Sequence, residues 1–289
     1  MRIYRQKDEP GKVLADINHA IKVNKPKVSE IQNSTLYWWK GYVYQDLKDI
    51  EKAAATLKTA YQLAQKDNPE YVSVIAFDYA QSLYVLEDLD GADAVYRKML
   101  ADDESDAGAM VGLARNMMDR GQYDEAEKQL LAAAKLSEDY PSIYRNLLQV
   151  YEKKGEINNA IDAAIEYVDK DSDPIWRYLI NVGEKNLNYA VANMRAKVKT
   201  SEHPIYWRAL IAELYYAAGK YELALKENIK LEEEAGKDDC LNSRKAECYR
   251  HLGMHEAAIA ELDQILAKEG DWNAYCERGI CYRLLGKFD

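Results

Sequence analysis

Alanine recurs at a fixed interval along this chain. Ala92, Ala126 and Ala160 are 34 residues apart, and Ala224 and Ala258 are separated by the same interval. Four copies carry Met or Tyr nine positions before the alanine and Gly five positions before it: Met117, Gly121 and Ala126; Tyr151, Gly155 and Ala160; Tyr215, Gly219 and Ala224; Tyr249, Gly253 and Ala258. Repeats of this length are typical of stacked supersecondary units. The chain is therefore expected to be an array of one small unit.

The spacing within each copy predicts a helical hairpin. One helix ends at the glycine, which permits a tight turn, and a second antiparallel helix carries the alanine. Two divergent copies place Ala53 and Ala92 nine residues after Tyr44 and Leu83. Small residues on the first helix would let the pair approach closely, and large residues on the second would fill the space between hairpins. The small positions are Gly41, Ala80, Ala114, Ala212, Ala246 and Gly279, and the large ones are Leu57, Tyr96, Leu130 and Leu262.

The composition favours an all-α chain and opposes two classes of function. The apolar period is close to that of a helix throughout, without a convincing alternating strand, and only 6 Pro and 14 Gly are present. The formal net charge of −10 opposes nucleic-acid binding, which needs a basic surface. Apolar runs of the roughly 18 residues that would indicate a spanning helix are missing, so no membrane insertion is expected. The absence of a signal peptide at the N-terminus favours a cytoplasmic location.

The repeat resembles the tetratricopeptide repeat (TPR) family. The resemblance is carried by the 34-residue period, by Tyr or Leu followed by Gly or Ala and then Tyr on the first helix, and by Gly-x-Tyr-x-x-Ala at the turn, as in Gly121 to Ala126 and Gly219 to Ala224. The proline usual at the repeat end is mostly missing. The resemblance implies an all-α fold, a right-handed alpha-alpha superhelix or TPR-like solenoid, whose first helices line a concave groove.

About seven helix pairs, with single helices at both ends, are expected to form one continuous solenoid over residues 1–289. The copy at 175–204 is degenerate, about four residues short, and the copy at 34–72 is about five residues long, which predicts an extended second helix. The expected repeats are 34–72, 73–106, 107–140, 141–174, 175–204, 205–238 and 239–271, with partial copies at 11–24 and 272–289.

Each end of the sequence looks like half a hairpin. Residues 11–24 resemble a second helix, and Tyr275 to Leu285 resemble a first helix whose partner should begin after Gly286. Because solenoid ends need polar caps, we expect the sequence to be part of a longer protein, the alternative being a short protein with frayed ends. The apolar face of the last helix, with Ile280 and Leu284, is expected to fray or to pack against another molecule. Self-association through this uncapped helix is therefore a further expectation.

The residue types that serve catalysis or metal binding form no convincing site, so neither enzyme activity nor a cofactor is expected. His251 and His255 are four residues apart, but Gly253 lies between them at a predicted turn and places them on different helices. The four cysteines match no zinc-binding pattern and are interpreted as small buried or half-buried thiols. Cys248 and Cys281 occupy the same repeat position, which indicates a packing role.

Projection of the inward positions of the first helices predicts a partner-binding groove. Its N-terminal zone is aromatic and amide-rich and its middle zone is basic and hydrogen-bonding: Trp38, Tyr42, Phe77, Gln81, Tyr84, Arg115, Arg145, Asn146, Gln149 and Lys153. A C-terminal zone offers Tyr206, Glu213, Tyr216, Arg250 and Arg283. Aromatic and Arg side chains are the types that become binding hot spots. Two alternatives stay open: Trp38 and Phe77 simply pack between adjacent first helices, and Arg115 and Arg145 are merely solvated at the surface.

Two functions from different classes follow from these features. The main hypothesis is a non-catalytic protein–protein interaction scaffold that binds a peptide or helix of a partner protein in the concave groove. The alternative is a regulatory or targeting arm of a larger multidomain enzyme. Nucleic-acid binding through helical repeats is a third possibility, which the net charge opposes.

Overall fold

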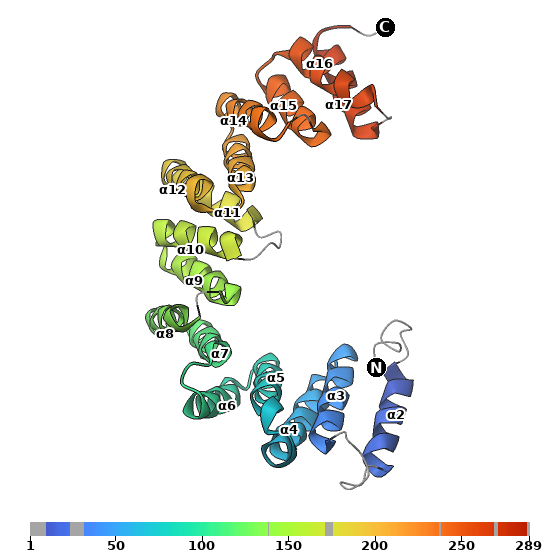
Figure 1. Cartoon of the computed structure of the whole chain (residues 1–289), viewed down its shortest axis with the longest axis vertical. Coiled ribbons are helices and arrows are strands. Elements are labelled where there is room, and N and C mark those ends of the chain that lie inside the picture. Colours follow the sequence, from blue (N-terminus) through green and yellow to red (C-terminus); the bar gives the residue numbers. More distant parts are fainter. Residues whose placement is uncertain are drawn as a thin grey trace. The chain divides into compact units, whose positions relative to one another are not determined.

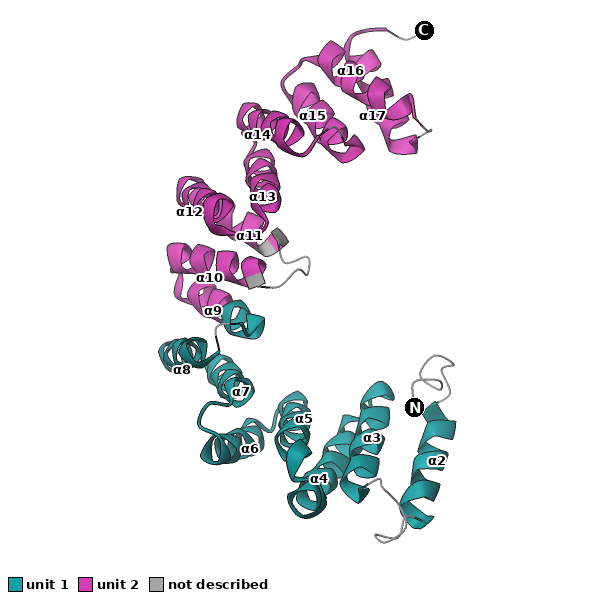
Figure 2. Ribbon diagram, in the orientation of Figure 1, with its two compact units in different colours: residues 1–146 teal, residues 147–289 magenta. Residues whose placement is uncertain are grey.

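The computed structural model of the chain describes residues 10–23, 32–137, 139–170, 176–236, 238–268 and 271–287. Over these ranges the ordered elements are helices and no strand is present, which confirms the all-α prediction. Consecutive helices pack against each other in pairs, for example α3 with α4 and α13 with α14. The chain divides into two compact units, residues 1–146 and 147–289 (Figure 2). One continuous solenoid over the whole chain stays a prediction.

In unit 1 the helices alternate between two sides (Figure 1). The first helices α3, α5 and α7 follow one side, and their partners α4, α6 and α8 follow the other. Helix α2 packs on α3 through Val13, Ile17 and Val43. The bounds are α2 Pro10–Val23, α3 Asn33–Asp46, α4 Ile50–Asp67, η1 Pro69–Tyr71, α5 Val72–Val85, α6 Leu89–Asp102, α7 Ala107–Asp119 and α8 Tyr123–Leu136.

Unit 2 repeats the pairing with one irregular step. Helix α9 (Pro141–Lys154) crosses the boundary between the units. Helix α11 has only 8 residues and continues into the 3-10 turn η2, and the degenerate copy at 175–204 stays a prediction. The bounds are α10 Ile157–Lys170, α11 Trp176–Gly183, η2 Glu184–Asn186, α12 Leu187–Thr200, α13 Pro204–Ala217, α14 Tyr221–Ala235, α15 Asp239–His251, α16 His255–Leu266 and α17 Trp272–Leu284.

Left-handed turns separate the two helices of most pairs. The glycines of the repeat motif have positive φ, for example Gly121 at 76° and Gly253 at 74°. The first two pairs have the same turn without glycine, because Lys48 has φ 58° and Glu87 has φ 60°. In each case the following amide closes onto a carbonyl five residues earlier, as Asp49 does onto Tyr44. The backbone motif is therefore retained where the sequence motif is lost.

The repeated alanines are the contact points of the hairpins. Ala53, Ala92, Ala126, Ala160, Ala224 and Ala258 are all 0% exposed. On the first helix, a Cβ added at Gly41 would meet the side chain of Leu57 at 2.6 Å, as expected for a close approach. A Cβ at Gly279 would meet nothing within 4 Å. The partner helix expected after Gly286 lies outside the described residues, so the close helix contact at Gly279 stays a prediction.

Candidate functional site

One carboxylate, Asp78, organises the N-terminal zone of the predicted groove. The indole Nε1 of Trp38 donates to Asp78 Oδ2 at 2.7 Å, and the hydroxyl of Tyr42 donates to the same oxygen at 2.5 Å. The Trp38 and Tyr42 ring centroids lie 5.6 Å apart, and all three side chains are half-buried. Trp38 and Tyr42 come from α3 and Asp78 from α5, so the two rings are held between neighbouring first helices. Asp78, which was not predicted from the sequence, stands one helical turn before Gln81 on α5.

A second network joins α5 to α7. The guanidinium of Arg115 donates to Gln81 Oε1 at 2.5 Å and stacks on the ring of Tyr84, with the guanidinium carbon 3.9 Å from the ring centroid. Burial raises the pKa of Tyr84, and a hydrogen bond to Asp119 raises it further. A planar cation fixed against an aromatic face has little freedom to lose when another molecule binds. The structure thus brings Gln81, Tyr84 and Arg115 together.

Phe77 faces the interior of unit 1. Its ring lies 6.0 Å from that of Tyr96, which is 0% exposed, and it contributes to the core cluster that contains Ala80 and Ala92. The amide of Gln81 donates to the Tyr96 hydroxyl at 2.8 Å. Burial is the main reason that the pKa of Tyr96 is raised to about 12. Phe77 thus packs against the second helix α6 of its own pair, and its role in a partner-binding groove stays a prediction.

The remaining predicted residues lie on α9. Arg145, Gln149 and Lys153 are exposed and follow one another at intervals of four residues, which places them on one face of the helix. Asn146 is only 9% exposed, and its amide donates to the Ser142 carbonyl of its own helix at 2.7 Å. Asn146 therefore supports α9 from within. The boundary between the units falls after Asn146, so this set is described apart from the residues of α3, α5 and α7.

In unit 2 the corresponding charges on first helices are largely paired. Glu213 of α13 forms an ion pair with Arg244 of α15, and Arg250 of α15 binds Glu277 of α17 at 2.9 Å. Arg283 is exposed on α17. The partners Arg244 and Glu277 were not predicted from the sequence, because repeat spacing alone does not reveal which charges meet across neighbouring helices.

Tyr206 and Tyr216 have different surroundings. Tyr206 is 39% exposed, and its ring meets that of Trp207 edge-on at 6.2 Å. The Tyr216 hydroxyl lies 3.2 Å from Nε2 of His251, whose ring stacks on Tyr221 at 4.2 Å. Burial is the main reason that the pKa of Tyr216 is raised to about 12. Tyr216 is thus held in a ring cluster.

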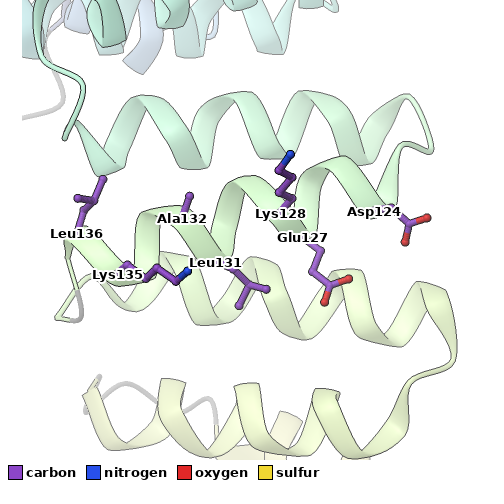
Figure 3. Close-up of a pocket in the computed structure, with 7 residues that line it drawn as sticks. All are labelled: Asp124, Glu127, Lys128, Leu131, Ala132, Lys135 and Leu136. Carbon is purple, nitrogen blue, oxygen red and sulfur yellow. The ribbon is translucent and has the colours of Figure 1, made fainter.

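Apolar side chains also form a stripe on α8 that the sequence analysis did not single out. Leu131 is 42% exposed and Leu136 is 55% exposed, and both line a shallow hollow along the helix (Figure 3). Lys128 and Lys135 border the same hollow. The equivalent positions on α6 are Arg97 and Asp102 by the 34-residue period, so the two exposed leucines are not part of the repeat pattern.

The described histidines and cysteines form no further candidate site. His251 ends α15 and His255 begins α16, so the two lie on different helices as predicted. In the described part of the chain no group of three or more His, Cys, Asp or Glu side chains is arranged to hold a metal ion. Cys248 and Cys281 are buried, and burial raises the pKa of Cys248 to about 11.

The prediction of buried or half-buried thiols is wrong for the other two cysteines. Cys240 lies in the first turn of α15 and Cys276 on the outer face of α17, and both are exposed. The packing that buries Cys248 and Cys281 therefore does not extend to these two thiols.

Among the described helices, none is both long and apolar enough to cross a membrane. Comparison with protein families gives two matches, both described as tetratricopeptide repeat: one over residues 86–151 and one over residues 34–67. No curated protein sequence matches the chain.

The solved structures that are similar to the chain include the following two. A tetratricopeptide repeat protein from Parabacteroides merdae ATCC 43184 shares 12% identity at a TM-score of 0.44, over 88% of this chain and 98% of that one. A structure of the APC/C hetero-tetramer Cut9–Hcn1 shares 17% identity at a TM-score of 0.42, over 94% of this chain. This chain spans 53% of the length of that second protein.

Stacked helix pairs, joined by left-handed turns and fixed by buried alanines, define an α-helical repeat protein. The two family matches fall on such pairs, and the chain belongs to the tetratricopeptide repeat family. Proteins of this family are in general repeat scaffolds for protein interactions, and the repeats of this chain suggest such a scaffold.

Proposed function

We propose that the chain binds an extended peptide or a helix of a partner protein across the first helices of unit 1. The observation that carries the proposal is the preorganised surface of Trp38, Tyr42, Tyr84 and Arg115, whose side chains are fixed by contacts across α3, α5 and α7. Hot spots in protein interfaces are enriched in these residue types. Side chains already held in one conformation lose little entropy on binding, which favours affinity.

Exposed residues of α9 are proposed as secondary contacts. Arg145, Gln149 and Lys153 present a basic and hydrogen-bonding face in a protein of formal net charge −10. Such a face favours a partner segment with acidic or carbonyl groups. Asn146 is assigned a supporting role, since its amide is used within α9. The alternative of a targeting arm of a larger multidomain enzyme would use the same surfaces and stays a prediction.

Peptides selected from a random display library against the whole chain provide the test. We expect Trp38→Ala or Arg115→Ala to weaken the selected peptides by about 30-fold, equivalent to about 2 kcal/mol for a hot-spot residue. Arg97→Ala on α6 and Leu131→Ala on α8 are the matched controls, because both residues are exposed and lie on second helices. The proposal fails if peptides bind all four variants as tightly as the unsubstituted chain.

Two gentler substitutions separate binding from folding. Tyr42→Phe removes only the hydroxyl that donates to Asp78, and Arg115→Lys keeps the charge but loses the planar contact with Tyr84. Both should retain the circular dichroism of the native chain while weakening the peptides by roughly three- to tenfold, about 1 kcal/mol. A loss of binding that always accompanied a loss of helicity would count against a direct contact.

A further inference from the structure

Asp78 of α5 carries a charge that has no counterion in the described part of the chain. Both of its hydrogen bonds, from Trp38 Nε1 at 2.7 Å and from the Tyr42 hydroxyl at 2.5 Å, come from neutral donors and fall on Oδ2. Among the described residues, no donor reaches Oδ1 and no Lys, Arg or His lies at ion-pair distance. Lys40 on α3 lies over the ring of Tyr44 instead. Asp78 is only half-buried, so Oδ1 is available to a further donor.

A second tryptophan–carboxylate pair, in unit 2, is completed by a cation of the chain itself. Trp207 of α13 donates to Asp169 Oδ1 at 3.3 Å, and Lys197 of α12 binds Asp169 Oδ2 at 2.7 Å. A carboxylate that is partly removed from water is stabilised most by an opposite charge at hydrogen-bond distance. The pair in unit 2 therefore shows which kind of group completes such an arrangement, and in unit 1 the oxygen for that group is open.

Exposed aromatic and apolar side chains surround Asp78 on the same side of α5. Tyr71 and Val74 stand seven and four residues before it in the sequence and are 45% and 47% exposed. The ring of Tyr71 lies 5.8 Å from that of Trp38, which lies 5.6 Å from the ring of Tyr42. Aromatic faces attract cations, and apolar surface covers the methylene groups of Lys and Arg. The surroundings thus fit both the stem and the head of a long basic side chain.

We propose that the partner segment places one basic side chain, Lys or Arg, at Asp78, with its cation on Oδ1 and its methylene groups over Tyr71 and Val74. The inference rests on the proposed function, since it names a residue type of the peptide that binds the first helices of unit 1. A charge-assisted hydrogen bond is about twice as strong as a neutral one. The charge on Asp78 therefore favours a basic residue over a neutral donor.

Arg115 of α7 limits the site to one basic residue. Its guanidinium binds Gln81, which stands one helical turn after Asp78, and among the described residues it forms no ion pair. A second cation of the partner on this side of Gln81 would meet a like charge. We therefore expect a single Lys or Arg between apolar residues rather than a run of basic ones.

Peptides selected from a random display library against the whole chain provide the first measurement. Those that need Trp38 and Arg115 for binding should share one Lys or Arg with apolar neighbours on both sides. In a matched peptide, norleucine replaces the lysine or citrulline replaces the arginine, which removes the charge at nearly the same size. The unsubstituted chain should bind this neutral peptide about tenfold more weakly than the basic one.

Asp78→Asn tests whether Asp78 makes the contact. Asparagine keeps an oxygen that accepts from Trp38 and Tyr42 but has no charge. The basic peptide should bind this variant about tenfold more weakly, whereas the neutral peptide should bind both chains within about twofold. Asp102→Asn on α6 is the matched control, because it removes the same charge from an exposed carboxylate on a second helix. It should retain the full preference for the basic peptide.

Asp78→Glu separates the charge from the fold. It keeps the carboxylate on a longer side chain and should retain the preference for the basic peptide, while circular dichroism checks that both Asp78 variants are folded. The comparison of the two peptides on the unsubstituted chain does not depend on either variant.

The outcomes distinguish this inference from the proposed function. Peptides that depend on Trp38 and Arg115 but share no basic residue would overturn the inference and leave the proposed function standing. A folded Asp78→Asn that kept the full preference for the basic peptide would do the same. Peptides that bind the Trp38 and Arg115 variants as tightly as the unsubstituted chain would remove both.

Discussion

The two units connect their neighbouring first helices by different chemistry. In unit 1, Trp38 and Tyr42 of α3 are neutral donors to the single carboxylate of Asp78 on α5. In unit 2, α15 and α17 are joined by two full charges, Arg250 and Glu277, at 2.9 Å. An ion pair occupies both of its members, whereas half-buried aromatic rings keep a face for another molecule. This difference in chemistry is the reason that the proposed binding surface is placed in unit 1.

The buried polar groups of the two units also differ in charge. Unit 1 buries small neutral groups such as Ser82 and Asn116, which are 2% and 0% exposed. Unit 2 buries charged ones: Glu227 is 4% exposed and Lys245 is 3% exposed. A buried charge is tolerated only while its partners remain, so the loss of one member is costly. Unit 2 therefore depends more on complete pairing than unit 1 does.

The largest expected effect follows from removal of the Lys245 charge. Burial disfavours the charged form, yet hydrogen bonds to Glu232 of α14 and Glu261 of α16 raise the pKa of Lys245, and both contacts measure 2.9 Å. Lys245→Met leaves two partly buried carboxylates without their cation. We expect a loss of about 3–5 kcal/mol of folding free energy. Urea denaturation measures the loss, and hydrogen exchange should locate it in α14 to α16.

Lys98→Met on α6 of unit 1 is the matched control. Lys98 pairs with Asp102 four residues along the same helix, and both side chains are 56% exposed. Its removal should change the free energy of unfolding by no more than about 0.5 kcal/mol. Equal losses in Lys98→Met and Lys245→Met would show that the buried cation in unit 2 has no special role.

The hairpins could be predicted from the sequence because their contacts repeat. Ala126 and Gly121 recur at a fixed spacing, and the structure gives one full burial and the other a left-handed turn. The equivalent turns at Lys48 and Glu87 have no glycine signal, and they form because helix packing on both sides imposes the conformation. Periodicity revealed the repeated contacts and missed the turns that depend on their surroundings.

The candidate site was less predictable for a related reason. Trp38 and Arg115 could be selected by residue type and helix position, and each has well-defined neighbours in the structure. Asp78, which fixes Trp38, lies 40 positions later in the sequence, and no local pattern indicates that they meet. Phe77 was assigned to the groove by the same projection, but its contact with Tyr96 draws it inward.

A second test compares one hairpin position in the two units. At Gly41 an added methyl group meets the fully buried Leu57, whereas at Gly279 it meets open space. Gly41→Ala should therefore overpack unit 1 and cost about 1–3 kcal/mol. Gly279→Ala should stabilise the monomer by about 0.5–1 kcal/mol, since alanine is the better helix former. Thermal unfolding of dilute samples measures both effects.

Gly41→Ala is expected to lower the free energy of unfolding and Gly279→Ala to raise it, so one systematic error of the measurement cannot produce both results. Destabilisation by Gly279→Ala at a concentration where the chain is monomeric would mean that α17 is already covered within one chain. Stabilisation by Gly41→Ala would mean that the contact with Leu57 is looser than the structure shows.

A third comparison concerns two carboxylates that each accept a tryptophan N–H, Asp78 in unit 1 and Asp169 in unit 2. Trp207 donates to Asp169 at 3.3 Å, and Lys197 binds the same carboxylate at 2.7 Å. Burial opposes ionisation, but these contacts lower the pKa of Asp169 below its usual 3.8. Asp169→Asn should lower the free energy of unfolding by about 1 kcal/mol at pH 7. This is less than the loss of a fully buried charged hydrogen bond, because the Asp169 side chain is 27% exposed and its charge is partly screened by solvent.

The pH dependence of that loss identifies its origin. A lowered folded-state pKa gives stability that is complete above the unfolded pKa near 3.8 and is lost as the pH falls further. The difference between Asp169→Asn and the unsubstituted chain in urea should therefore shrink between pH 5 and about pH 3. In Asp78→Asn the amide oxygen still accepts the Trp38 N–H, so this variant should lose less than Asp169→Asn at pH 7. If the loss of unfolding free energy in Asp169→Asn did not change with pH, it would come from altered packing. The charge of Asp169 would then not distinguish unit 2 from unit 1 at this position.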